Sequence, residues 1–216
     1  AARSSAAPPH SQPSRDMPLD QLYKKLEVDF ETRLKNYEEH IGLVRMRDDV
    51  MIEYVTLCNL LGMHEKAYET IMSHIFGPWE GAEGKITAQY KTALREMAKK
   101  RLEEEKYAEA EELLERCLSY PENLGEGRLE GTKDNNIYYY LGIVKKHLGK
   151  TEEALDCFHL AELGENEPAG VMYYYDQPAD MILYKGLAKQ ELGKSREAHA
   201  CFNKLMDYGE QHLGDE

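Results

Sequence analysis

Two segments in the C-terminal half of this chain repeat the same phrase with its small residues in register. The first, YYYLGIVKKHLGKTEEALDCFHLA, spans 138–161, and the second, YKGLAKQELGKSREAHACFNKL, spans 184–205. Each holds two apolar patterns of helical spacing, separated by a Gly-Lys dipeptide that breaks the helix. A phrase that returns in this way predicts a structural module made of two helices and a tight turn.

The small residues of the phrase stand where two helix backbones would have to touch. Gly142 and Ala154 are these residues in the first copy, and Phe158 follows Ala154 by four. A Leu-Gly pair, a turn and then Ala-x3-Phe resembles the tetratricopeptide repeat, a helix–turn–helix unit. Gly186, Ala198 and Phe202 fall in the same places in the second copy.

Earlier parts of the chain carry weaker copies of the phrase. The alanines Ala67, Ala110, Ala154 and Ala198 are 43 or 44 residues apart, and an aliphatic residue replaces the Phe in the first two copies. HEAT and armadillo repeats share this period but lack the Gly-turn-Ala-x3-Phe phrase. We therefore expect an all-α fold: a tetratricopeptide-repeat-like right-handed superhelix of antiparallel helix pairs with long inter-repeat loops.

The repeats divide the chain into a short leader and one helical domain. Residues 1–16 are rich in Ala, Ser and Pro, and we expect a disordered linker or an expression remnant, with a transit peptide as the alternative. Residues 17–216 form the helical repeat domain, and its first unit is degenerate, so that the chain begins inside an array. Asp48 or Asp49 is expected to cap the first helix of the second unit. The expected units are 17–47, 48–84, 85–134, 135–178 and 179–212.

Charge and cysteine usage limit the partners. The chain has 27 basic and 40 acidic residues and a net charge of −13, which disfavours nucleic acid and anionic membrane surfaces. No apolar run approaches the roughly 18 residues of a spanning helix. Four cysteines without CxxC spacing, each inside an apolar helical pattern, indicate buried thiols in a reducing, cytoplasmic compartment. The histidines show no HExxH spacing, and no phosphate-binding or nucleophile motif occurs, so we expect no catalytic residues, metal or cofactor.

A period of 44 exceeds the roughly 34 residues of an ordinary tetratricopeptide repeat. The excess forms three inserts at 77–85, 120–135 and 165–180, each marked by Gly, Pro and Asn. All three join a second helix to the next first helix, so we expect them on one edge, where per-repeat insertions often form the binding face. GPWEGAEGK, YPENLGEG and MYYYDQPAD within them resemble the C-terminal arrays of large bacterial proteins that carry an N-terminal β-sandwich domain of unknown function. That resemblance implies the helical tail of a longer protein.

Aromatic and polar residues of the inserts supply the predicted contacts. Trp79, the only tryptophan, could staple its loop or offer a stacking platform. Tyr139 is placed on the concave face by its repeat position, and its tyrosine neighbours could equally be core. The residues predicted to bind a ligand or partner are Trp79, Glu80, Lys85, Asn123, Tyr139, Tyr173, Tyr174, Asp176 and Gln177.

These features predict a non-enzymatic protein–protein interaction and scaffolding module that binds through its inserts and concave face. Its partner would be a protein, a peptide or a neighbouring domain of the same longer chain. The Lys/Asn set that grips a peptide carboxylate in some tetratricopeptide domains is missing from the concave positions. The alternative function is an accessory domain of a carbohydrate-active enzyme, whose loops would contribute to a sugar-binding site.

Overall fold

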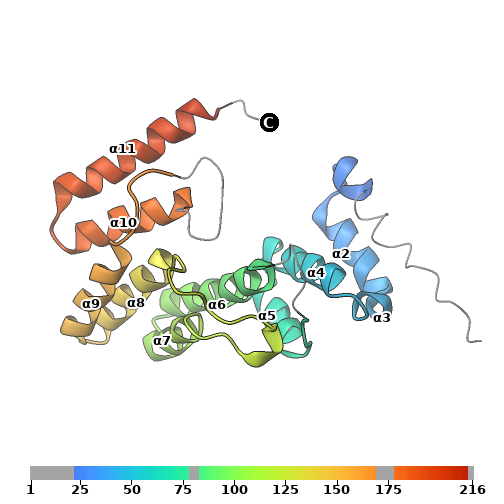
Figure 1. Ribbon diagram of the computed structural model, residues 1–216. Helices are drawn as coiled ribbons and strands as arrows, with labels where there is room; N and C mark the ends of the chain where they lie inside the picture. Colours follow the sequence, from blue (N-terminus) through green and yellow to red (C-terminus); the bar gives the residue numbers. More distant parts are fainter. Residues whose placement is uncertain (1–21, 78–82, 169–177, 214–216) are drawn as a thin grey trace, which may run out of the picture.

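The chain folds into successive antiparallel helix pairs (Figure 1). The computed structural model describes residues 22–77, 83–168 and 178–213, and within these ranges every regular element is a helix. The pairs are α4–α5, α6–α7, α8–α9 and α10–α11, preceded by α2 and α3. The bounds are α2 (Phe30–Glu39), α3 (Ile41–Val44), α4 (Asp48–Leu60), α5 (His64–Met72), α6 (Lys85–Glu103), α7 (Tyr107–Arg116), the 3-10 helix η1 (Glu122–Leu124), α8 (Asn135–His147), α9 (Thr151–Ala161), α10 (Ala179–Glu191) and α11 (Ser195–Gln211).

The pairs stack into a superhelical array, as the repeat phrase predicts. Figure 1 shows the array passing from α2 at the right to α8–α9 at the left, where α10–α11 continue it. One buried apolar cluster extends without interruption from Leu34 in α2 to Cys157 in α9. A second, smaller cluster joins α9 to α10 through Phe158 and Ala188. Each pair therefore buries its apolar face against its neighbours, which is how repeat arrays gain stability. The all-α, tetratricopeptide-repeat-like fold is confirmed.

The glycines of the phrase mark the closest approach of paired helices. A Cβ added to Gly142 would lie 2.6 Å from Cδ1 of Phe158, and one added to Gly186 would lie 2.9 Å from Cδ1 of Phe202. Both distances are far below the ordinary contact of carbon atoms, about 3.5–4.0 Å. The four periodic alanines are all buried. The sequence phrase therefore records an interhelical contact that leaves no room for a larger side chain.

The turns inside the pairs follow one backbone pattern. Gly62, Gly149 and Gly193 have φ values of 73°, 75° and 74°, in the left-handed region that glycine occupies without steric cost. The next residue donates its N–H back across the turn in each case, for example from Lys150 to the carbonyl of Lys145 at 2.9 Å. These bonds satisfy carbonyls that a helix end leaves without partners. The α6–α7 turn places Glu105, with φ 59°, in the equivalent position.

The expected cap of α4 is wrong in detail. Arg47 occupies the N-cap position without a side-chain cap bond, and Asp48 and Asp49 lie in the first turn. Their carboxylates still complement the positive end of the helix dipole there. Asp48 instead contacts the segment after α5: its Oδ1 lies 2.7 Å from Nε2 of His74, and its Oδ2 accepts the Gly77 N–H at 2.8 Å. The aspartate therefore fixes the start of the first insert.

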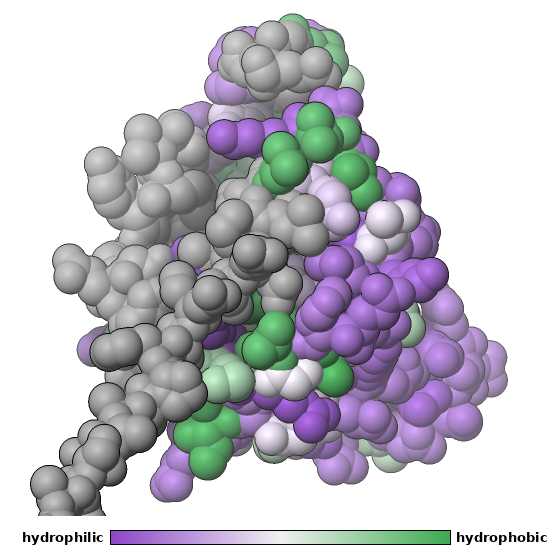
Figure 2. Space-filling view, turned by 90° about the vertical axis from the view of Figure 1, so that its right-hand side faces the viewer, coloured by the Kyte–Doolittle hydropathy of each residue, from purple (hydrophilic) through white to green (hydrophobic). Residues whose placement is uncertain are grey.

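The described part of one face of the array is predominantly polar. Figure 2 views the array from the side that lies at the right of Figure 1, and there small green groups are separated by purple side chains. Exposed apolar residues in the N-terminal part of the array include Phe30 in α2, Leu43 in α3 and Met46 in the turn that follows. Within the described ranges, no helix is both long and apolar enough to cross a membrane.

Candidate functional site

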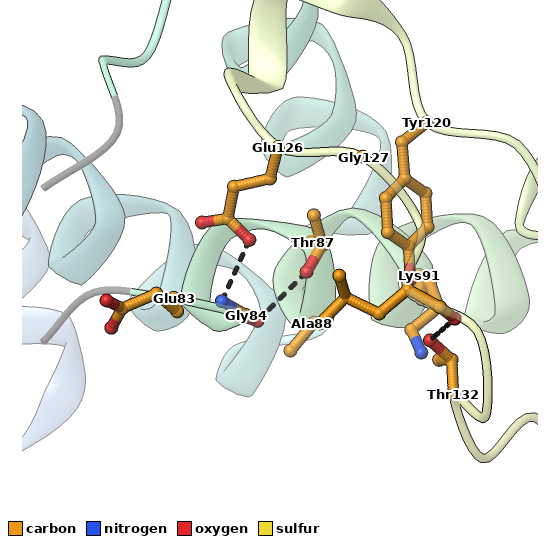
Figure 3. A pocket seen from close by; sticks show the side chains of 10 residues that line it. Glu83, Gly84, Thr87, Ala88, Lys91, Tyr120, Glu126, Gly127 and Thr132 are labelled. Atoms are coloured by element: carbon orange, nitrogen blue, oxygen red, sulfur yellow. Dashed lines mark hydrogen bonds between the residues drawn. The ribbon is translucent and has the colours of Figure 1, made fainter. Parts of the chain in front are cut away.

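The insert at 120–135 folds back over the first turns of α6 and encloses a cavity of about 450 Å³, called the insert cavity below (Figure 3). That volume lies within the range of about 300–1,000 Å³ usual for ligand pockets. One wall is a single face of α6, formed by Gly84, Thr87, Ala88 and Lys91. The insert supplies the other wall through Tyr120, Glu126, Leu129 and Thr132. Its lining is mostly apolar, with charged groups at the two ends.

A carboxylate ties the insert to α6 at one end of the insert cavity. Oε2 of Glu126 accepts the backbone N–H of Gly84 at 2.8 Å, and Thr87 Oγ1 donates to the Gly84 carbonyl at 3.1 Å. Figure 3 shows the Glu126 side chain reaching Gly84 where α6 begins, while the Glu83 side chain points away from the other lining residues. A carboxylate is favourable beside a helix N-terminus because the unpaired N–H groups there carry partial positive charge. The contact ties the insert at 120–135 to the end of the insert at 77–85.

The other end is held by a buried aspartate. Asp134 has a fully buried side chain, and its two oxygens accept separately, Oδ1 from Lys91 Nζ at 2.9 Å and Oδ2 from Arg128 Nη2 at 2.8 Å. A buried carboxylate is costly unless it is paired and hydrogen-bonded, and here both requirements are met. Burial raises the pKa of the neighbouring Tyr120 phenol, so the ring stands in the wall as a neutral group.

Asn123 fastens the middle of the insert to the preceding repeat. Its side-chain amide donates to the carbonyls of Ile71 and His74 at 2.8 and 2.9 Å, and its own carbonyl accepts the Phe76 N–H at 2.8 Å. These bonds satisfy the Ile71 carbonyl in the last turn of α5, which has no partner within the helix, and the His74 carbonyl in the segment that follows. The predicted binding residue Asn123 thus has an observed role in positioning the insert.

A second surface lies where α8 meets α10. The rings of Tyr139, Tyr140 and Tyr184 form a triangle with centroids 5.5–5.8 Å apart, and Phe158 lies 6.2 Å from Tyr139. All three tyrosines are half-buried. Tilted aromatic contacts at such distances are favourable beyond the area they bury. We call these three residues the tyrosine cluster.

Charges of α6 lie close to the tyrosine cluster. Burial, reinforced by the hydrogen bond between Tyr184 and Tyr140, raises the pKa of Tyr184 to about 12, while the nearby charges of Arg95 and Lys99 oppose the increase. Arg95 and Lys99 share the Glu96 carboxylate, at 3.0 and 2.7 Å. The surface therefore combines neutral phenol groups with two cations and one anion of α6, and the Glu191 carboxylate of α10 lies near Tyr139.

The structure places only three of the nine predicted site residues. Asn123 lies in η1, Lys85 is the exposed first residue of α6, and Tyr139 belongs to the tyrosine cluster. Lys85 and Asn123 thus lie in the two inserts that the structure brings together, and Tyr139 lies on another surface. The other predicted residues fall outside the described ranges: Trp79, Glu80, Tyr173, Tyr174, Asp176 and Gln177.

Sequence reasoning missed the residues that shape the insert cavity. Leu129, Asp134 and Lys91 carry no motif, because their proximity depends on the path of the insert. A weak signal was present in Leu129, a large apolar residue in an otherwise polar loop. Among the described residues, no group of three or more His, Cys, Asp or Glu side chains has the geometry to hold a metal ion.

No family model matches the chain. Among solved structures, it is similar to a crystal structure of MamA, with 15% identity and a TM-score of 0.42 over 88% of this chain and 94% of that one. A MamA RS-1 double mutant has 14% identity and a TM-score of 0.46, over 93% and 96% of the two chains. The TPR-like repeats of a Podosopora anserina putative kinesin light chain have 13% identity and a TM-score of 0.43, over 91% and 94%. None of these likenesses is close enough to assign a role to a residue of this chain.

Proposed function

We propose that this chain is a non-enzymatic interaction and scaffolding module that holds a partner protein on its concave face and on its insert edge. The tyrosine cluster is the observation that supports it most directly. Tyr139, Tyr140 and Tyr184 combine a large apolar area with hydroxyl groups, and they remain partly accessible. Tyrosine is enriched at the centres of protein interfaces for this reason.

The charges beside the cluster favour a polar partner segment over a purely apolar one. Arg95 and Lys99 together carry one more charge than Glu96 neutralises. An acidic or hydroxyl-bearing side chain of the partner would find donors there. Rigidity of the array contributes as well, because an interface that needs little reordering loses less entropy on binding.

The four cysteines support a cytoplasmic setting. Cys58, Cys117, Cys157 and Cys201 are free and buried. Burial raises the pKa of Cys117 to about 12, so its thiol stays protonated and unreactive. Free thiols kept in this way are usual in reducing compartments.

The partner on this proposal is a separate protein or a neighbouring domain of the same longer chain. The likeness of the three inserts to helical arrays of large bacterial proteins supports the second source. The carbohydrate alternative depends on Trp79 and on residues 173–177, which lie outside the described ranges. It stays a prediction without an observation of its own.

Site-specific photo-crosslinking tests the proposal. p-Benzoylphenylalanine placed at Tyr139 should form crosslinks to a defined partner in cells, since the half-buried ring lies within the contact surface. Tyr208, a half-buried tyrosine that stacks on His212 in α11, is the matched control position. Crosslinks of equal yield from both positions, or none from position 139, would contradict binding at the tyrosine cluster.

A further inference from the structure

We propose that the insert cavity and a smaller hollow beside it form one groove, which binds an extended segment of a partner protein. The segment would place two apolar side chains in the groove and a basic residue at the end where α6 begins. This inference rests on the insert-edge part of the proposed function and uses no residue of the tyrosine cluster.

The two hollows adjoin at one turn of the insert. Thr132 lines both, and the smaller hollow, about 200 Å³ in volume, continues to Tyr138, Leu160 and Leu163. The turn is stabilised by Thr132 itself, whose Oγ1 donates to the carbonyl of Leu129 at 2.6 Å. A segment that crosses this turn would therefore meet one apolar hollow on each side of it.

Exposed leucines line the groove. Leu129 is 52% exposed, Leu160 44% and Leu163 60%, and none of the three belongs to the two buried core clusters. A single exposed leucine is normal on a protein surface. Three exposed leucines that border adjoining hollows form an apolar surface whose burial by a partner is favourable. Apolar side chains of a partner would remove this surface from water.

Charge decides the polarity of the segment. The Glu126 carboxylate lies at the α6 end of the insert cavity, whereas Lys91 and Arg128 at the other end are both paired with the buried Asp134. A lysine or arginine can lay its aliphatic stem along an apolar wall and bring its charge to a carboxylate. The α6 end therefore suits a basic residue.

The same charges disfavour a second copy of this chain as the occupant. Its net charge is −13, so two copies repel each other, and a basic segment of a different protein is the better complement. The groove is also formed in advance, since Glu126 and Asp134 hold the insert to α6 at both ends. Preorganisation of this kind lowers the entropic cost of binding.

Fluorescence anisotropy with synthetic peptides tests the inference. The probes are labelled ten-residue peptides of Ser and Gly with two leucines, spaced by one to four residues and preceded by Lys or by Glu. At least one Lys peptide should bind the full chain and lose at least about tenfold in affinity when Leu129→Asp removes an apolar anchor contact. Ile75→Asp is the control, because Ile75 is an 82% exposed loop residue that lines neither hollow.

A second pair of measurements separates the charge from the apolar contact. Glu126→Gln keeps an acceptor for the Gly84 N–H but loses the charge, so the preference for Lys over Glu peptides, expected at about threefold, should shrink. Leu163→Asp reports on the smaller hollow in the same way, and it provides the test if Leu129→Asp alters the melting curve. The inference is overturned if Lys and Glu peptides bind with equal affinity. It is also overturned if every peptide binds the wild type and both leucine variants equally well.

The concave-face proposal fails or survives independently. A Tyr184→Ser variant should retain the peptides in full, because Tyr184 lines neither hollow. If position 139 gives no crosslinks in a chain with an intact Tyr184, while the peptides still bind, the result counts against the tyrosine cluster alone. If Tyr184→Ser abolishes peptide binding, the peptides bind outside the groove, and this inference is overturned.

Discussion

The two later helix pairs and the two earlier pairs fill the space between their helices with different combinations of residue size. Where α8 and α10 present a glycine, α9 and α11 present Phe158 and Phe202. The positions 44 residues before Gly142 and Phe158 hold Ala98 and Leu114, both buried. A further 43 residues earlier they hold Val55 and Ile71. From Gly142–Phe158 to Ala98–Leu114 the residue on the first helix becomes larger and its partner becomes smaller, so the summed side-chain volume stays nearly constant. The Val55–Ile71 pair is larger, because valine exceeds alanine while isoleucine and leucine have the same volume.

An ion pair across the turn occurs in the three later pairs, whereas the equivalent positions of α4–α5 hold Cys58 and Lys66. Lys145 contacts Glu153 at 2.8 Å, Lys189 contacts Glu197, and at the equivalent positions of α6–α7 Arg101 contacts Glu109 at 3.0 Å. The Lys145 side chain is 10% exposed and that of Arg101 is 27% exposed, whereas Glu153 and Glu109 are both more than half exposed. Lys145 also contacts Glu111, whose side chain is only 13% exposed, so its ion pairs are the more buried set.

The largest expected effect comes from exchanging one packing solution for the other. Gly142→Ala should lower the free energy of unfolding by about 3 kcal/mol, the upper end for overpacking, because the new Cβ would overlap the Phe158 ring. Phe158→Leu in the same chain recreates the Ala98–Leu114 pair and should recover part of the loss. Urea unfolding of the two single variants and the double variant measures the coupling between the positions.

A coupling energy of at least about 1 kcal/mol is expected for residues in direct contact. Ala98→Gly with Leu114→Phe, the reverse exchange in α6–α7, is the matched control and should show coupling of the same sign. Additive effects at both places would contradict the idea of a constant shared volume.

The next effect concerns the ion pairs. Lys145→Met should lower the free energy of unfolding at pH 7 by about 2 kcal/mol, because Glu111 and Glu153 each lose a charge-assisted hydrogen bond. Arg101→Met should cost less than about 1 kcal/mol, since its partners are exposed. Thermal or urea unfolding of the two variants measures the difference, and equal losses would show that burial of the bridge is unimportant.

The pH dependence of the Lys145→Met variant sharpens this result. Burial alone would raise the pKa of Glu111, but hydrogen bonds from Lys145 and Lys150 outweigh it and leave the pKa below the usual 4.5. A carboxyl group with a lowered pKa in the folded state stabilises the protein above the unfolded-state pKa and loses that contribution as the pH falls through the folded-state pKa. The difference between wild type and variant should therefore shrink below about pH 4.5.

How much the sequence predicts follows from the same comparison. The Gly142–Phe158 contact is readable because glycine and phenylalanine are extremes of size, and the 43- or 44-residue period then locates the milder Ala98–Leu114 and Val55–Ile71 pairs. Asp134 and Leu129 were not predictable as site residues, because they become neighbours of α6 only through the fold of an irregular insert. Periodic packing is encoded locally, whereas the insert cavity depends on contacts between segments that share no pattern.

The smallest effect should come from the turn that departs from the others. Glu105 has φ 59°, where the equivalent turn positions hold Gly62, Gly149 and Gly193. A residue with a Cβ in this conformation costs about 1–2 kcal/mol relative to glycine, partly offset by the greater freedom of glycine in the unfolded chain. Glu105→Gly should therefore raise the free energy of unfolding by about 1 kcal/mol, and Gly149→Ala should lower it by a similar amount. If Glu105→Gly instead lowers the free energy of unfolding, the Glu105 side chain stabilises the α6–α7 turn by more than its backbone strain costs.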